Sequence, residues 1–179
     1  MLARCDAGIV SASTLLVDRS YPMPKSIILL RHAEEPPPEA DSPDLSKPGR
    51  RRADKLARYI VETFGKPDFL FAAGPKGDSV RAYLTLRPLA DACGLVIDGS
   101  YESREFAQLA SKVLHDPRFD HSRIVVAWTH KELPTLASAL GAPRKAFPKV
   151  WGDDLYDICF QLSYRKNGKP SVRRFQHPF

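Results

Sequence analysis

The sequence predicts an α/β fold, a three-layer α/β/α sandwich built on a mostly parallel sheet. Two continuous apolar runs, at 26–31 and 123–128, have the length and composition of strands buried on both faces. Between the predicted strands, apolar residues recur every three or four positions, which is the period of amphipathic helices. Strand and helix alternate about four times, so we expect parallel strands joined by right-handed crossovers, with helices on both faces.

The first predicted strand, 26–31, runs into a loop at 35–48 whose five prolines exclude a helix. The next helix begins at Ser46 or at the Lys-Pro pair that follows it, and Gly65 ends it. Its apolar residues fall on one face at helical spacing: Ala53, Leu56, Ala57, Ile60, Val61 and Phe64.

The middle of the chain continues the alternation in shorter elements. It contains a strand at 68–73, a helix near 79–93 that Pro88 breaks or kinks, and a weak strand at 95–98. A helix at about 103–115 comes before the strand at 123–128, and a helix from about 131 to 140 comes after it.

Near the C-terminus apolar residues alternate with mostly polar ones, which is typical of a strand with one solvent-exposed face. The alternating residues are Tyr156, Ile158, Phe160, Leu162 and Tyr164. The Asn-Gly pair at 167–168 is typical of a tight hairpin, and 171–175 is the predicted return strand at the sheet edge.

Length and composition bound the class of protein. The 179 residues suffice for one domain with a substantial core, predicted at 25–179, preceded by a loosely ordered extension at 1–24. No apolar run approaches the roughly 18 residues that a membrane span needs, so we expect no membrane partner. The three cysteines are far apart and form no CxxC motif, which argues against a disulfide framework or a zinc site and favours a reducing, cytoplasmic location.

The net charge of +6 fits either a solvated basic surface or attraction to anions. The densest basic run, 49–58, lacks the interleaved aromatic residues that single-stranded nucleic acid binding uses. Nucleic acid is therefore disfavoured as a partner, and a phosphorylated small molecule is favoured over a phosphoprotein. Nothing in the sequence specifies an oligomeric state.

Four basic side chains should meet at one edge of the sheet. Ligands of open α/β sheets bind beyond the carboxyl ends of the strands. The first strand ends at Arg31 and His32, and the strand at 123–128 leads to His130. Arg81 lies near the start of the helix after the second strand. We therefore expect two histidines and two arginines, distant in sequence, to converge there.

Such a set suits phosphoryl transfer. Guanidinium groups present planar forks of N–H donors to phosphate oxygens. A neutral imidazole can attack phosphorus and form a phosphohistidine, and a protonated one can stabilise charge on the transferring group. Because the protein supplies these cations itself, no metal or cofactor is required.

The order of these motifs resembles the histidine phosphatase superfamily, whose fold is phosphoglycerate mutase-like. The resemblance covers roughly residues 25–165. The matching segments are Arg31-His32-Ala33-Glu34, DLSKPGRRRA, SVRAYLT with Arg81, VVAWTHKELPTLASALG with His130, and VWGDDLYDICFQL.

By this resemblance His32 would be the nucleophile, and Arg31, Arg81 and His130 would bind the phosphoryl group. Glu34 is either a residue at the rim of the phosphate pocket or a solvated loop charge, and Lys131 would add positive charge for an anionic leaving group. The candidate general acids are Glu102 and Glu105, ranked ahead of Glu132.

The resemblance implies a phosphatase that hydrolyses phosphate monoesters through a phosphohistidine on His32. Three alternatives stay open: a phosphoglycerate-type mutase, a catalytically weak phosphate-binding domain on the same fold, and a nucleic-acid binder. We expect the remaining polar residues to lie on the surface without a functional role. His115, His121 and His177 have no evident partners, and the arginines at 50–52 resemble a solvated helix start.

Overall fold

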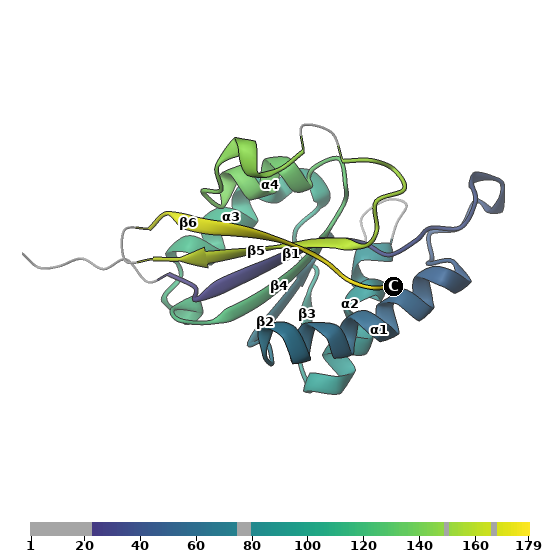
Figure 1. The fold of residues 1–179 in the computed structure, drawn as a ribbon, viewed down its shortest axis with the longest axis horizontal. Helices are drawn as coiled ribbons and strands as arrows, with labels where there is room; N and C mark the ends of the chain where they lie inside the picture. The colour runs from purple at the N-terminus through teal and green to yellow at the C-terminus, as the bar shows by residue number, and fades with distance from the viewer. Residues whose placement is uncertain (1–22, 75–79, 149–150, 166–167) are drawn as a thin grey trace, which may run out of the picture.

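The structure is a computed structural model that describes residues 23–74, 80–148, 151–165 and 168–179. It contains one six-stranded sheet in the order β3-β2-β4-β1-β5-β6, with helices on both sides (Figure 1). The strands are β1 (Ser26–Arg31), β2 (Phe69–Ala72), β3 (Ile97–Asp98), β4 (Arg123–Trp128), β5 (Ile158–Tyr164) and β6 (Pro170–Gln176). Most of the predicted N-terminal extension, residues 1–22, lies outside the described residues, as does Asn167 of the predicted Asn-Gly turn.

The sheet is mixed, so the prediction of a mostly parallel sheet is wrong. Strands β1, β4, β2 and β3 pair in parallel, but β5 runs antiparallel to β1, and β6 runs antiparallel to β5. The register pairs Leu30 with Cys159, so β5 begins beside the end of β1 and runs back along it. An antiparallel neighbour needs no helical crossover, and this is how the C-terminal hairpin joins the sheet.

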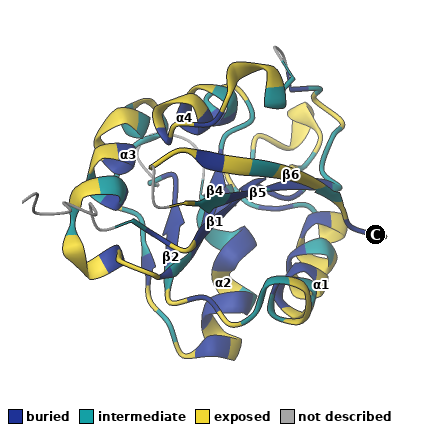
Figure 2. Ribbon diagram, turned by 60° about the vertical axis from the view of Figure 1, so that its left-hand side comes forward, coloured by how far each residue is buried: buried dark blue, intermediate teal, exposed yellow. Residues whose placement is uncertain are grey.

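Two pairs of helices cover the two faces of the sheet (Figure 1). Helices α1 (Lys47–Phe64) and α2 (Arg81–Cys93) pack together on one face, and α3 (Phe106–His115) and α4 (Leu133–Ala139) lie on the other. Strands β1 and β4 are buried along almost their whole length, whereas the edge strand β6 is largely exposed (Figure 2). The three-layer arrangement is therefore confirmed. Among the described residues, no helix is long and apolar enough to cross a membrane.

Local sequence signals explain where the helices begin and end. The Ser46 hydroxyl accepts a hydrogen bond from the Gly49 N–H and caps α1, and Gly65 ends the helix with a φ of 86°. Helix α2 continues through Pro88 without a break. Strand β5 starts only at Ile158, so Tyr156, which was predicted to lie in this strand, belongs to the loop at 151–157 that precedes it.

Candidate active site

Strands β1 and β4 deliver the two histidines to the same edge of the sheet. They are parallel neighbours in which Arg31 pairs with Trp128, so the residues that follow each strand emerge side by side. The His32 backbone N–H donates to the Trp128 carbonyl at 3.1 Å, which extends the pairing by one residue. The ring centroids of His32 and His130 are 6.3 Å apart in an edge-on arrangement.

His32 is held in the form that a nucleophile needs. Its Nδ1 lies 2.8 Å from the carbonyl oxygen of Ala33, so Nδ1 carries the proton and Nε2 keeps its lone pair. Burial lowers the pKa of His32 to about 4, and the positive charges of Arg31 and Arg81 act in the same direction. The imidazole is therefore neutral at neutral pH.

The loop at 151–157 fixes Arg31. Nη1 of Arg31 donates to the carbonyl oxygens of Gly152 at 3.1 Å and Asp153 at 2.6 Å. Nη2 donates to the Tyr156 hydroxyl at 3.0 Å. The guanidinium carbon also lies 4.0 Å from the centroid of the Tyr156 ring, a cation–π distance. These contacts set the position of Arg31 beside His32.

Arg81, the first residue of α2, reaches the same site from the other direction. It donates from Nε to the Asp44 carbonyl at 3.2 Å and from Nη2 to the Ser42 carbonyl at 2.7 Å. Its Nη1 lies 2.7 Å from Oε2 of Glu35, whose Oε1 is 3.7 Å from Nη2 of Arg31. One carboxylate therefore bridges the two arginines, which confirms that they converge.

Unpaired buried polar atoms gather at this edge. Within the described ranges, the buried side-chain atoms without a hydrogen-bond partner are Arg31 Nε, Glu34 Oε2, Thr129 Oγ1 and His130 Nδ1. All four belong to residues at or just beyond the ends of β1 and β4. Leaving such a group unpaired costs about 1–3 kcal/mol, and a catalytic or ion-binding role is one explanation for such groups in native proteins. The guanidinium, hydroxyl and protonated imidazole can each donate to an oxygen-rich anion.

His130 can change its protonation when an anion binds. Its Nε2 is 3.1 Å from Oδ1 of Asp153. Burial lowers the pKa of His130, the Arg31 charge lowers it further, and the Asp153 carboxylate opposes them. A phosphoryl dianion beside the ring would favour the imidazolium, which then has donors on both nitrogens.

Glu34 is tied to helix α1 by a strong ion pair. Arg52 contacts Oε1 of Glu34 through Nε at 2.8 Å and through Nη2 at 2.7 Å. Burial, the largest single influence, raises the pKa of Glu34, but the hydrogen bond from Arg52, a backbone hydrogen bond and the charge of Arg52 together hold this pKa below its ordinary value. Arg52 is therefore not simply part of a solvated helix start.

The other predicted site residues lie around the same edge. Lys131 is exposed beside His130, and its charge helps to lower the pKa of that histidine. Glu102 precedes the 3₁₀ turn η2 (Ser103–Glu105) and Glu105 is its last residue, and the Glu105 carboxylate accepts the Glu102 backbone N–H at 2.8 Å. The indole of Trp128 donates to the Ser103 carbonyl at 3.0 Å, which places this turn beside the end of β4.

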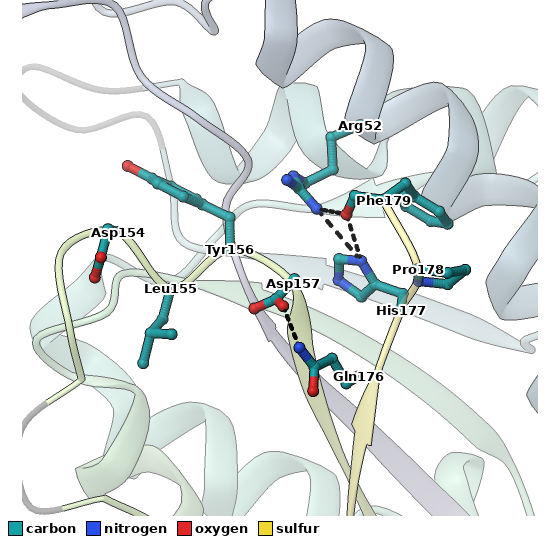
Figure 3. A pocket seen from close by; sticks show the side chains of 9 residues that line it. All are labelled: Arg52, Asp154, Leu155, Tyr156, Asp157, Gln176, His177, Pro178 and Phe179. Atoms are coloured by element: carbon teal, nitrogen blue, oxygen red, sulfur yellow. Dashed lines mark hydrogen bonds between the residues drawn. The ribbon is translucent and has the colours of Figure 1, made fainter.

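A cavity lies between the loop at 151–157 and the C-terminal segment (Figure 3). It is lined by Arg52, Asp154, Leu155, Tyr156, Asp157, Gln176, His177, Pro178 and Phe179. His177 is only 2% exposed, so its prediction as a surface residue is wrong. After β6 the chain turns back onto α1, where the His177 ring meets Tyr59 at 5.7 Å and Arg52 contacts the Phe179 carbonyl.

Four residues of the site were missed by sequence reasoning: Glu35, Thr129, Asp153 and Tyr156. Glu35 and Thr129 directly adjoin predicted site residues, so proximity in the chain was an available signal. Asp153 and Tyr156 come from a loop more than 120 positions after Arg31, and only the contacts across the fold reveal them. Among the described residues, no group of three or more His, Cys, Asp or Glu side chains is arranged to hold a metal ion.

No protein-family model and no curated protein sequence matches the chain. Solved structures do. A mycobacterial glucosyl-3-phosphoglycerate phosphatase in complex with inorganic phosphate is 19% identical, with a TM-score of 0.56 over 87% of this chain and 97% of its own. A phosphoglycerate mutase from Plasmodium falciparum is 17% identical, with a TM-score of 0.56 over 88% and 96%. The protein histidine phosphatase SixA complexed with tungstate is 13% identical, with a TM-score of 0.52 over 84% and 96%.

Proposed function

The chain has the fold of the histidine phosphatase superfamily, and we propose that it is a phosphatase that hydrolyses phosphate monoesters through a phosphohistidine on His32. One observation supports this most directly. The neutral, buried imidazole of His32 lies near Arg31 and Arg81 and beside His130, and both Arg31 Nε and His130 Nδ1 are buried without a partner. That combination suits a tetrahedral anion and a nitrogen nucleophile.

In the proposed complex the phosphoryl oxygens are bound by Arg31, Arg81 and His130. Two guanidinium groups and an imidazolium neutralise the charge that phosphoryl transfer spreads over the equatorial oxygens. Arg31 and Arg81 are already positioned by backbone carbonyls of loops 151–157 and 42–44. Little reorganisation is needed at the moment of reaction, which is the main advantage of a preorganised site.

The chemistry then takes two steps. Nε2 of His32 attacks phosphorus in line, so that a P–N bond forms as the bond to the leaving oxygen breaks. The leaving oxygen takes a proton from a general acid, a contribution of about 10²–10⁴-fold. Water next attacks the phosphohistidine, which releases inorganic phosphate and restores His32.

Carboxyl groups on two loops are candidates for the general acid. Glu102 and Glu105 are the first candidates, because the turn that carries them contacts the end of β4 through Ser103. Asp153 is a third candidate, because its exposed carboxylate already contacts His130. Lys131 would attract an anionic leaving group, and Glu34 would orient the loop after His32 through its pair with Arg52.

We favour small phosphorylated molecules over phosphoproteins as substrates, and a cytoplasmic location. The basic charge of the chain attracts small anions without requiring a protein partner. Two of the three cysteines, Cys93 and Cys159, are free and buried, which is compatible with a reducing compartment.

The decisive test is to replace the nucleophile. His32→Ala should abolish turnover of p-nitrophenyl phosphate, and a rapid acid-free quench with ³²P-labelled substrate should trap label on the wild-type chain but not on this variant. His115→Ala, which removes an exposed histidine, should leave both readouts unchanged. Turnover by a folded His32→Ala protein would refute the mechanism.

A mutase is the second candidate, because the fold is shared with a phosphoglycerate mutase. A mutase returns the phosphoryl group from histidine to a substrate hydroxyl, whereas a phosphatase passes it to water. A coupled assay for interconversion of phosphoglycerates, run beside release of inorganic phosphate, distinguishes the two. Interconversion faster than phosphate release would favour the mutase.

A further inference from the structure

Glu35 lies between the two arginines that would bind the phosphoryl group. Its Oε2 is 2.7 Å from Nη1 of Arg81, and its Oε1 is 3.7 Å from Nη2 of Arg31. A carboxylate offers two charged oxygens to guanidinium groups, as a phosphoryl group does. The Glu35 carboxylate therefore makes the contacts that a substrate would need.

We propose that Glu35 is an internal competitor for the phosphoryl group, a tethered carboxylate that occupies the subsite between Arg31 and Arg81 until substrate displaces it. The inference rests on the proposed function, because the competition matters only if these arginines bind phosphate. It assigns Glu35 a role in setting affinity, separate from the nucleophile and the general acid.

The surroundings of Glu35 allow its side chain to leave while the loop stays in place. The side chain is 38% exposed, so it can rotate into solvent. Three prolines, Pro36 to Pro38, follow it and restrict the backbone, and the Glu34 carbonyl accepts the Ser46 N–H at 2.9 Å. The movement therefore involves side-chain torsions only, which change in picoseconds to nanoseconds at exposed positions.

A tethered competitor weakens the binding of every anion that uses the two arginines. Groups joined by short flexible links compete at effective concentrations of about millimolar, so a free anion of equal intrinsic affinity must exceed this level to displace the carboxylate. A phosphate monoester gains further contacts through its leaving group, whereas inorganic phosphate does not. These leaving-group contacts do not depend on Glu35, so Glu35 should raise the Kd of substrate and of product by the same factor, and the weaker binding of inorganic phosphate helps its release after hydrolysis.

Calorimetric titration of the full chain with inorganic phosphate tests this inference. Glu35→Gln should bind phosphate with a Kd about fivefold lower than that of wild type, because the neutral amide competes poorly for guanidinium groups. Glu39→Gln is the matched control. Glu39 is exposed in the same loop, in the 3₁₀ turn η1 (Pro38–Ala40), and its loss removes the same charge. It should change the Kd by less than about twofold.

An unchanged or higher Kd in Glu35→Gln would overturn the inference, and a higher Kd would mean that Glu35 positions the arginines instead. Glu35→Ser provides a second variant if the glutamine variant does not fold, and its Kd for phosphate should also be lower than that of wild type.

Arg81→Ala separates the role of Glu35 from the proposed function. If Arg81→Ala binds phosphate as well as wild type, the proposed function fails. If it loses phosphate while Glu35→Gln equals wild type, only the role of Glu35 fails.

Discussion

At the scale of single residues, the burial of His32 makes the free energy of unfolding depend on pH. The folded protein lowers the pKa of His32 from 6.5 to about 4, chiefly by burial. Between these values the unfolded chain binds the proton more readily, so stability must fall as the pH falls from 6.5 towards 4 and stays unaffected by this group above 6.5. The shift corresponds to about 3 kcal/mol at pH 4.

Urea unfolding of wild type and His32→Asn at pH 7 and pH 4 measures this effect. Wild type should lose about 3 kcal/mol more than the variant over this interval, because asparagine does not titrate. The exposed His115 provides the comparison, since His115→Asn should keep the full loss seen in wild type. If the unfolding free energy fell equally in wild type and His32→Asn, the protonation of His32 would not be the cause of the loss of stability at low pH.

At the scale of elements, the start of helix α1 supports the loop that follows His32. A Cβ atom at Gly49 would lie 2.3 Å from the Glu34 carbonyl oxygen, which is closer than real Cβ atoms approach backbone. Only glycine therefore lets α1 pack against this loop. Gly49→Ala should lower the unfolding free energy by about 1–3 kcal/mol and also reduce kcat/KM, because the backbone of Glu34 must move.

Denaturant unfolding and steady-state kinetics on Gly49→Ala check both effects. Arg51→Ala, an exposed change in the same turn, should alter stability by no more than about 0.5 kcal/mol. A Gly49→Ala protein with wild-type stability and activity would contradict this prediction, because the loop after His32 would then accommodate the added Cβ atom without loss of unfolding free energy or kcat/KM.

At the scale of the whole molecule, the net charge of +6 should steer anionic substrates to the site. Raising the ionic strength from about 0.02 M to 0.5 M should lower kcat/KM for p-nitrophenyl phosphate about three- to tenfold, because screening shortens the reach of the protein's field. Kinetics in sodium chloride and in sodium acetate separate screening from competition by one anion. A kcat/KM that does not depend on salt would contradict electrostatic steering.

The sequence predicted those parts of the fold that depend on local patterns. Continuous apolar runs located β1 and β4, and the spacing of apolar residues, Ser46 and Gly65 located α1. The direction of β5 was not accessible in this way, since an apolar strand pattern does not state which neighbour the strand joins. The mixed sheet follows from long-range pairing between β1 and β5.

The same division applies to the candidate site. The sequence by itself determined that Arg31, His32 and His130 follow buried strands, because parallel strands bring their carboxyl ends to one edge. Only the tertiary structure decided that Tyr156 and Asp153 hold Arg31, that Glu35 bridges the arginines, and that His177 is buried. These contacts join segments that are far apart in the chain, and the order of the segments does not show which of them meet in the fold. They form because packing closes loops over the edge of the sheet, where buried charges must find partners.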